Sequence, residues 1–330
     1  MWDFKLLKAT QTLEKTMTYM IYRLAMYLLL SLVLLFGIVA GTGSGLILDS
    51  MGSSSQFLVR AGGILGLLIF SLILYWFRGP WFFSMRAPHI GLLNEAAEDA
   101  LKQQGWAQVE YARELITRRF GNSAELFTLD RRIRAVLAHL FLKLNPIGQK
   151  LAGIERTPFS AVLFNIIEIP ATYVHEVVIS YCLKAQNRSA SAAALTALNL
   201  YGRNFNRLFK NAVVLLLLKY AIVLIIYLAM LSPVDWIDDI FPVDFGNWRY
   251  IFAALLTWPI KSALFDPITI AAMITLFHEL SQGQDEDPEL HAKLAEDCPE
   301  FASLIRQSDF LESQSEAAEE SENKAQNPLT

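Results

Sequence analysis

The sequence predicts an all-α, polytopic membrane protein with a cytoplasmic helical insert and a disordered acidic tail. Three observations predict this class. Hydrophobic residues make up 54% of the 330 residues, above the roughly 45–50% of soluble domains. They are concentrated in runs close to the roughly 20 residues that a helix needs to cross the hydrocarbon core. Charge is distributed unevenly among the connections between these runs, although the net charge is only −4.

Four runs are long and apolar enough to be membrane spans: Met20–Ala40, Leu58–Phe77, Asn211–Leu231 and Tyr250–Glu279. Lys219 interrupts the third run, and Pro259, Lys261, Asp266 and Pro267 interrupt the fourth. The first run is too long for the apolar part of a signal peptide and has no convincing cleavage site. We therefore expect it to be a retained span.

The distribution of lysine and arginine predicts the orientation of these spans. The N-terminal segment, Arg78–Arg156 and Lys184–Lys210 are rich in basic residues. Gly41–Gln56 and Ser232–Trp248 contain no basic residue. Because basic connections stay in the cytoplasm, we expect both termini there and these two short loops outside. The expected location is the plasma membrane or a bacterial inner membrane.

The same pattern divides the chain into five segments. They are 1–77, an N-terminal helix and two spans; 78–157, a cytoplasmic helical insert; 158–210, an interfacial or re-entrant helix and a basic linker; 211–280, two further spans; and 281–330, an acidic cytoplasmic tail. The tail is predicted to hold a short helix near Pro288–Gln307 and to be disordered beyond Ser308, because hydrophobicity is low and charge is high there.

A basic amphipathic helix is predicted at Leu129–Leu144, within the insert. Arg131, Arg132 and Arg134 precede its apolar residues, a pattern that suits a patch lying along an anionic membrane surface. The alternative is that its apolar side packs on a neighbouring helix.

The segment Phe159–Leu183 is long enough to cross the membrane but carries polar residues at helical spacing: Asn165, Glu168, Thr172, His175 and Glu176. Crossing would place the basic linker outside, so we favour an interfacial or re-entrant helix. The alternative is a span whose polar stripe faces a path through the membrane, because ionisable groups at that depth usually mark ion, proton or substrate routes.

No motif predicts a catalytic residue, a cofactor site or a metal site. Gly41–Gly45 resembles a nucleotide loop but follows an apolar run rather than a strand, so we interpret it as a flexible turn. His175-Glu176 and His278-Glu279 lack the second histidine of a zinc motif. The two cysteines, Cys182 and Cys298, form neither a disulfide framework nor a metal spacing.

Lys219 and Asp266 are charged residues inside predicted spans. At 1.5 Å per residue, Lys219 lies about 12 Å from the cytoplasmic end of its span and Asp266 about 20 Å from Glu279. The last span is longer than the bilayer needs, so part of it should protrude into the cytoplasm. The two groups then lie at similar depth, and we expect an intramembrane ion pair. In the alternative, Lys219 extends to the headgroups and Asp266 marks a kink. Lys261 is another partner for Asp266 but points well round an α-helix.

Short strings in the C-terminal third resemble the choline-transporter-like membrane protein family. They are Lys184-Ala185-Gln186-Asn187-Arg188, Leu200-Tyr201-Gly202-Arg203-Asn204-Phe205, Asn211-Ala212, Lys261 with Phe265, and Thr275-Leu276-Phe277 leading into Glu279-Leu280. The resemblance covers about a hundred residues and implies solute handling and a cytoplasmic basic linker. The chain is shorter than members of that family and lacks their other spans and large extracellular loop, so no substrate-binding residue is carried over.

Two functions follow from these patterns. The first is a non-enzymatic scaffold or accessory subunit of a membrane complex, with lipid bilayer around its spans and protein partners on its insert and tail. The alternative is a transporter of a small solute or ion, working as a homo-oligomer, in which Glu168, His175, Glu176, Lys219 and Asp266 surround the path. Neither function involves nucleic acid.

Overall fold

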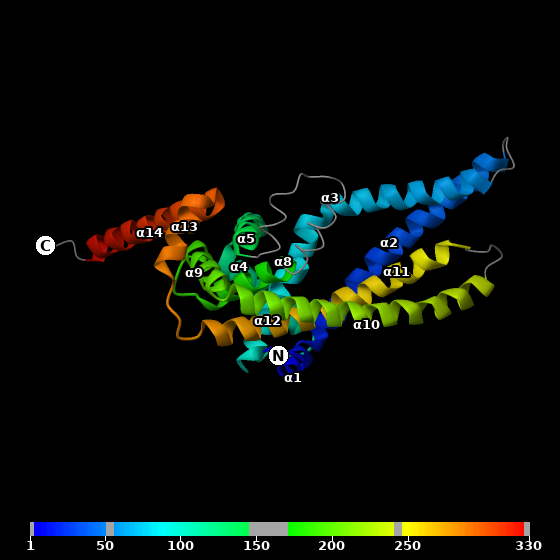
Figure 1. Cartoon of the computed structure of the whole chain (residues 1–330). Helices are drawn as coiled ribbons and strands as arrows, with labels where there is room; N and C mark the ends of the chain where they lie inside the picture. The colour runs from blue at the N-terminus through cyan, green and yellow to red at the C-terminus, as the bar shows by residue number, and fades with distance from the viewer. Residues whose placement is uncertain (1–2, 51–55, 145–170, 241–245, 327–330) are drawn as a thin grey trace.

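The computed structural model describes residues 3–50, 56–144, 171–240 and 246–326, and within these ranges every regular element is a helix (Figure 1). The helices are α1 (Leu6–Lys15), α2 (Met17–Ser50), α3 (Gln56–Ala97), α4 (Ala107–Phe120), α5 (Ser123–Leu144), α8 (Ala171–Lys184), α9 (Ala190–Arg203), α10 (Phe205–Ile240), α11 (Trp248–Ile260), the π-helix η1 (Lys261–Phe265), α12 (Asp266–Ser281), α13 (Pro288–Asp297) and α14 (Pro299–Gln326). The all-α class predicted from the sequence is confirmed.

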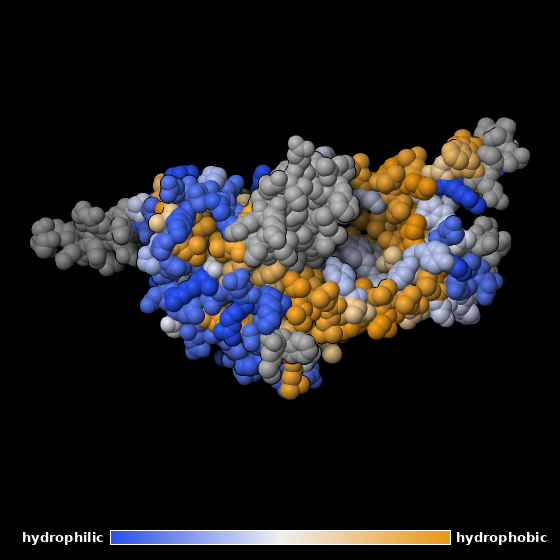
Figure 2. Space-filling model, viewed as in Figure 1, coloured by the Kyte–Doolittle hydropathy of each residue, from blue (hydrophilic) through white to orange (hydrophobic). Residues whose placement is uncertain are grey.

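Four helical stretches are long and apolar enough to cross a membrane: Met17–Ser50, Phe57–Phe77, Phe205–Asp239 and Trp248–Ser281. They coincide with the four apolar runs of the sequence. Figure 2 shows the surface of α2, α3, α10 and α11 as a largely apolar region on one side of the molecule. Exposed leucines such as Leu68, Leu72 and Leu224 contribute to it. Soluble monomers rarely expose apolar side chains contiguously along several long helices, so this surface suits a surrounding of lipid.

The four stretches form two helical arms that meet at their bases. One arm is α2 packed along α3, and the other is α10 packed on α11. Between the arms, α2 also contacts α11, where the Ser31 hydroxyl donates a 2.7 Å hydrogen bond to the Leu255 carbonyl. Towards their far ends the arms diverge (Figure 1).

Close backbone packing through glycine joins α2 to α3. A β-carbon at Gly41 would lie 2.1 Å from the carbonyl oxygen of Gly62, and one at Gly66 would lie 2.0 Å from that of Gly37. The interpretation of Gly41–Gly45 as a flexible turn was therefore wrong, because α2 continues as a helix to Ser50. Small residues favour this close contact between apolar helices and outweigh the low helix propensity of glycine.

The remaining helices form a compact head around one hydrophobic core. The core takes residues from α1, the C-terminal part of α3, α5, α8, α9, the N-terminal part of α10, α12 and α14, among them Leu13, Ile90, Val136, Val178, Leu198, Leu208, Phe277 and Phe301. Helix α12 belongs to this core, and nearly all of its apolar side chains are buried. The fourth apolar run is long because α11 belongs to an arm and α12 to the head.

Two helices bear on the sequence-based boundaries. Helix α3 runs without a break through residues 77 and 78, and its apolar stretch ends there, at Phe77. The prediction of disorder beyond Ser308 was wrong, because α14 is helical from Pro299 to Gln326. Its first turns are fixed to the core by Phe301 and Leu304, and glutamate and alanine, good helix formers, continue the helix.

Helix α5 follows the packing alternative. Its apolar residues Val136, Leu137, Leu140 and Phe141 are buried in the head core. The three arginines at its start do not form one surface: Arg131 is exposed, Arg132 bonds to Gln307 of α14, and Arg134 turns inward to α8. Contact of this helix with a membrane surface stays a prediction.

Candidate functional site

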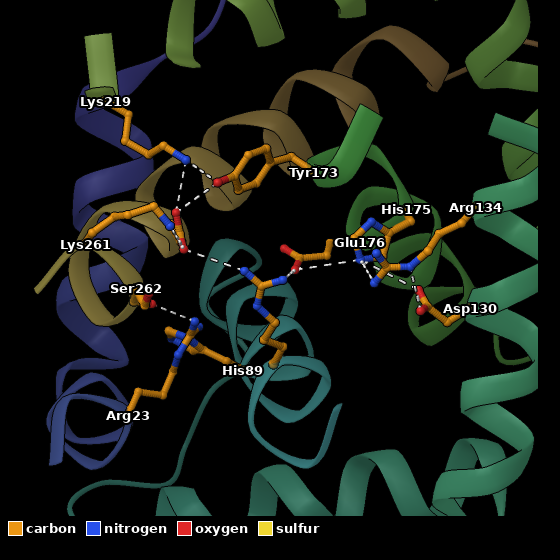
Figure 3. Close-up of polar contacts among 12 residues, drawn as sticks. Arg23, His89, Asp130, Arg134, Tyr173, His175, Glu176, Lys219, Lys261 and Ser262 are labelled. Carbon is orange, nitrogen blue, oxygen red and sulfur yellow. Dashed lines mark hydrogen bonds and ion pairs between the residues drawn. The ribbon is translucent and has the colours of Figure 1, made fainter. Parts of the chain in front are cut away.

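A network of charged side chains lies where the arms join the head, and Asp266 is at its centre (Figure 3). Lys219 Nζ lies 3.1 Å from Asp266 Oδ1, and Lys261 Nζ lies 3.1 Å from Oδ2. Arg86 Nη2 is 3.6 Å from the same Oδ2. The hydroxyl of Tyr173 donates a 3.0 Å hydrogen bond to Oδ1 and accepts one from Lys219. The structure thus brings together the Lys219–Asp266 pair expected from the sequence.

Burial makes this pair unusual. The side chain of Asp266 is 0% exposed and that of Lys219 is 2% exposed. Lys219 follows Leu215 and Leu216 by one helical turn and shares their buried face of α10, whereas Leu217 and Tyr220 are exposed. The lysine therefore points into the junction rather than along the outer surface, which contradicts the alternative that it extends to the headgroups.

The π-helix η1 explains why Lys261 also reaches Asp266. Five residues apart on an α-helix, the two would point well away from each other. In η1 the backbone N–H of Asp266 donates to the carbonyl of Lys261, the five-residue step of a π-helix. This wider turn brings both side chains to one side. The expectation that Lys261 points away was wrong because the sequence does not reveal the π-turn.

Pro267 leaves the backbone carbonyl of Ser262 free to accept a hydrogen bond from the side chain of Arg23. Proline has no N–H, so the carbonyl of Ser262, five residues earlier, lacks its π-helical donor. Arg23 Nη2 of α2 donates a 2.8 Å hydrogen bond to that carbonyl. A proline in one helix thereby fixes an arginine from another.

Arg23 also determines the state of His89. Arg23 Nη1 lies 2.7 Å from His89 Nδ1, and an arginine can only donate, so Nδ1 must accept and carries no proton. The proton is then on Nε2, which lies 3.1 Å from the hydroxyl of Thr16. Burial, followed by the nearby Arg23 charge, lowers the pKa of His89 well below its usual value. His89 is therefore neutral at physiological pH.

From Arg86 the network continues into the head. Arg86 Nη1 lies 3.4 Å from Glu176 Oε1. The preceding residue of α8, His175, accepts at Nε2 a 2.8 Å hydrogen bond from Arg134 Nη2. Arg134 Nε donates at 2.8 Å to Asp130 Oδ2. Because the side chain of Arg134 is 47% exposed, the network extends from buried Asp266 to solvent.

The two carboxylates in the head are held in a desolvated environment. Burial raises the pKa of Glu176 above its usual value, and the Arg86 and Arg23 charges only partly oppose this. Burial likewise raises the pKa of Asp130, against the nearby Arg134. Neither oxygen of Glu176 has a hydrogen-bond donor within the described ranges. Glu176 is therefore the carboxylate of the network that is least stabilised in its charged form.

The structure places some of the predicted polar stripe in this network. His175 and Glu176 belong to it, and Thr172 lies in α8. Asn165 and Glu168 lie outside the described residues. Arg23, Arg86 and His89 were not recognised from the sequence as site residues. Arg23, next to the basic N-terminal segment, and Arg86, within the basic range 78–156, contributed only to the predicted orientation. The three-residue step from Arg86 to His89, which puts both on one helical face, was the available signal.

The other chemical candidates stay isolated. His278 is partly buried near Ser180, 3.5 Å away, and the hydroxyl of Ser180 is bonded to Asn94. Cys182 and Cys298 are free thiols and buried. Within the part of the chain that the structure describes, no three His, Cys, Asp or Glu residues gather as metal ligands.

Comparison of the chain with protein-family models, with curated proteins and with solved structures gives no significant match. The resemblance to choline-transporter-like proteins stays a prediction.

Proposed function

We propose that the chain is an integral membrane protein that crosses the bilayer four times and serves as a non-enzymatic scaffold or accessory subunit of a membrane complex. The head and both termini lie in the cytoplasm, following the basic residues. The observation that carries the proposal is the position of the charge network. It connects α10 and α12 with α3, α8 and α5, and so ties the apolar arms to the head.

Such a network suits rigid coupling. A buried charge that loses its partner is strongly destabilising, so the helices cannot separate without a large energetic cost. A head that is fixed to its membrane arms presents its surface in one orientation to partners. The apolar stretch Phe57–Phe77 of α3, only 11% buried, leaves a broad face for lipid or for a neighbouring membrane protein.

The observation that favours transport instead is the reach of the network from buried Asp266 to exposed Arg134. Alternating acids, bases and a histidine between a membrane-level charge and solvent are typical of proton or ion routes. The resemblance to the choline-transporter-like family points in the same direction. The path would need partners or further copies of the chain on the outer side.

A reconstitution experiment separates the two functions. The purified chain is placed in liposomes that contain a pH-sensitive dye, and a membrane potential is imposed with potassium and valinomycin. A scaffold gives the same dye response as empty liposomes. A dye response that Glu176→Gln abolishes, and that the surface variant Asp235→Asn leaves intact, would reject the scaffold in favour of proton transport.

A further inference from the structure

Positive charge is in excess around η1. Arg23, Arg86, Lys219 and Lys261 lie there, against the two carboxylates of Asp266 and Glu176. In the part of the chain that is described, the excess is therefore two positive charges in a largely buried region. Isolated charges in such surroundings cost several kcal/mol or more unless they are paired.

Arg23 is the basic residue of this group whose positive charge is least balanced by nearby carboxylates of the described residues. It is 1% exposed, and its hydrogen-bond partners are neutral, the Ser262 carbonyl and His89 Nδ1. No carboxylate of the described residues lies within ion-pair distance of its guanidinium. Its Nε–H, like that of Arg86, is buried without an acceptor among these residues. Two guanidinium groups thus each retain an unused donor.

The same region is open to the surface at its edge. The side chain of Lys261 is 21% exposed and that of Arg86 is 24% exposed, whereas Lys219 and Asp266 are closed off. Figure 2 shows a hollow between the two apolar arms, whose bases meet where α2 contacts η1 and α11. Lys261 and Arg86 are thus the partly exposed basic residues of this region, whereas Arg23 is buried and bonds to the Ser262 carbonyl (Figure 3).

We propose that Arg23, Arg86 and Lys261 form a binding site for a phosphate-type anion at the junction of the arms and the head. Guanidinium groups present forked donors that match phosphate oxygens, and a lysine supplies a compact positive charge. The anion supplies the missing negative charge and accepts the unused donors. Two sources have this chemistry: the headgroup phosphate of an anionic lipid at the membrane surface and free inorganic phosphate.

The experiment uses the full chain in nanodiscs and four forms of it: the unaltered chain, Arg23→Gln, Lys261→Gln and the control Arg249→Gln. Arg249 carries the same charge but lies at the far end of α11, where it pairs with exposed Asp235. The lipid experiment compares discs of phosphatidylglycerol with discs of phosphatidylcholine and counts the retained lipid by native mass spectrometry. The phosphate experiment uses phosphatidylcholine discs and measures binding of radiolabelled inorganic phosphate. Circular dichroism verifies that each form is helical.

Retention of phosphatidylglycerol that falls at least tenfold in Arg23→Gln and Lys261→Gln, but not in Arg249→Gln, supports the site and assigns it to a lipid headgroup. Saturable phosphate binding with the same pattern supports it and assigns it to a free anion. Should Arg23→Gln fail to fold, Lys261→Gln decides, because its side chain is partly exposed. If neither phosphatidylglycerol nor phosphate binds, or if Lys261→Gln and Arg249→Gln bind equally, the proposal is overturned.

Discussion

Replacing Asp266 by asparagine should be the most damaging single change to the network. The variant keeps the size of the side chain but leaves Lys219, Lys261 and Arg86 around a neutral amide, with Lys219 and Lys261 each 3.1 Å from an oxygen of the native carboxylate. Breaking a buried ion pair by removing one partner costs about 3–5 kcal/mol. We expect Asp266→Asn to lower the free energy of unfolding by this amount.

Removing Lys219 should cost less. In Lys219→Met, Asp266 still has Lys261, Arg86 and the Tyr173 hydroxyl as partners. The loss is then about 1.5–3 kcal/mol, the value of a hydrogen bond to a charged group. In the double variant the two losses should not add, and the coupling should exceed about 0.5 kcal/mol because the groups are in direct contact. A charge swap is a poor test, since a lysine at position 266 would face Lys261 and Arg86.

Equilibrium unfolding in mixed micelles, with sodium dodecyl sulfate as the denaturant and circular dichroism as the signal, measures these differences. Asp235→Asn is the matched control, because Asp235 pairs with Arg249 at a site where both side chains are over 40% exposed. It should cost less than about 1 kcal/mol. A buried, coupled pair is contradicted if Asp266→Asn costs no more than Asp235→Asn, or if the losses of the Lys219 and Asp266 variants add.

Two further predictions concern the arm packing and the response to pH. Gly41→Leu should destabilise the chain by about 1–3 kcal/mol in the same assay, because its β-carbon would lie 2.1 Å from the Gly62 carbonyl oxygen. Gly43→Leu, with no atom within 4 Å of its β-carbon, should not destabilise, and equal effects would contradict the packing. The pKa of His89 is lower in the folded chain than the usual 6.5 of an exposed histidine. Below pH 6.5 the unfolded chain therefore binds more protons at this residue than the folded chain does. Stability should fall as pH drops below about 6.5, by at most about 1.4 kcal/mol per unit from this group. His89→Asn, which keeps an acceptor for Arg23, should reduce that slope, and an unchanged slope would show that His89 does not titrate as described.

The four apolar runs were predictable because length and hydropathy alone determine them. The continuation of α2 through Gly41 was not predictable. Glycine by itself indicates a turn, and only the facing glycines of α3 explain why the helix continues. The helical path of α14 likewise depends on Phe301 and Leu304 reaching a core that is built mostly from distant helices.

The Lys219–Asp266 pair was predictable because an unpaired charge inside an apolar helix demands a partner. The rest of the network was not. Arg86 and Arg23 look like ordinary flanking bases in the sequence, and only the π-turn at Lys261–Phe265 with Pro267 behind it brings them to one place. Local backbone irregularity of this kind leaves no periodic signal.

Labelling with a membrane-impermeant maleimide tests whether the arms cross the bilayer with the head on one side of it. Single cysteines replace the exposed residues Ser50, Asp239 and Arg203, and the unaltered chain, whose Cys182 and Cys298 are buried, is the blank. In intact cells we expect the cysteines at positions 50 and 239 to react and the one at position 203 to react only after the membrane is opened. Reaction of positions 50 and 203 from the same side would contradict the four crossings.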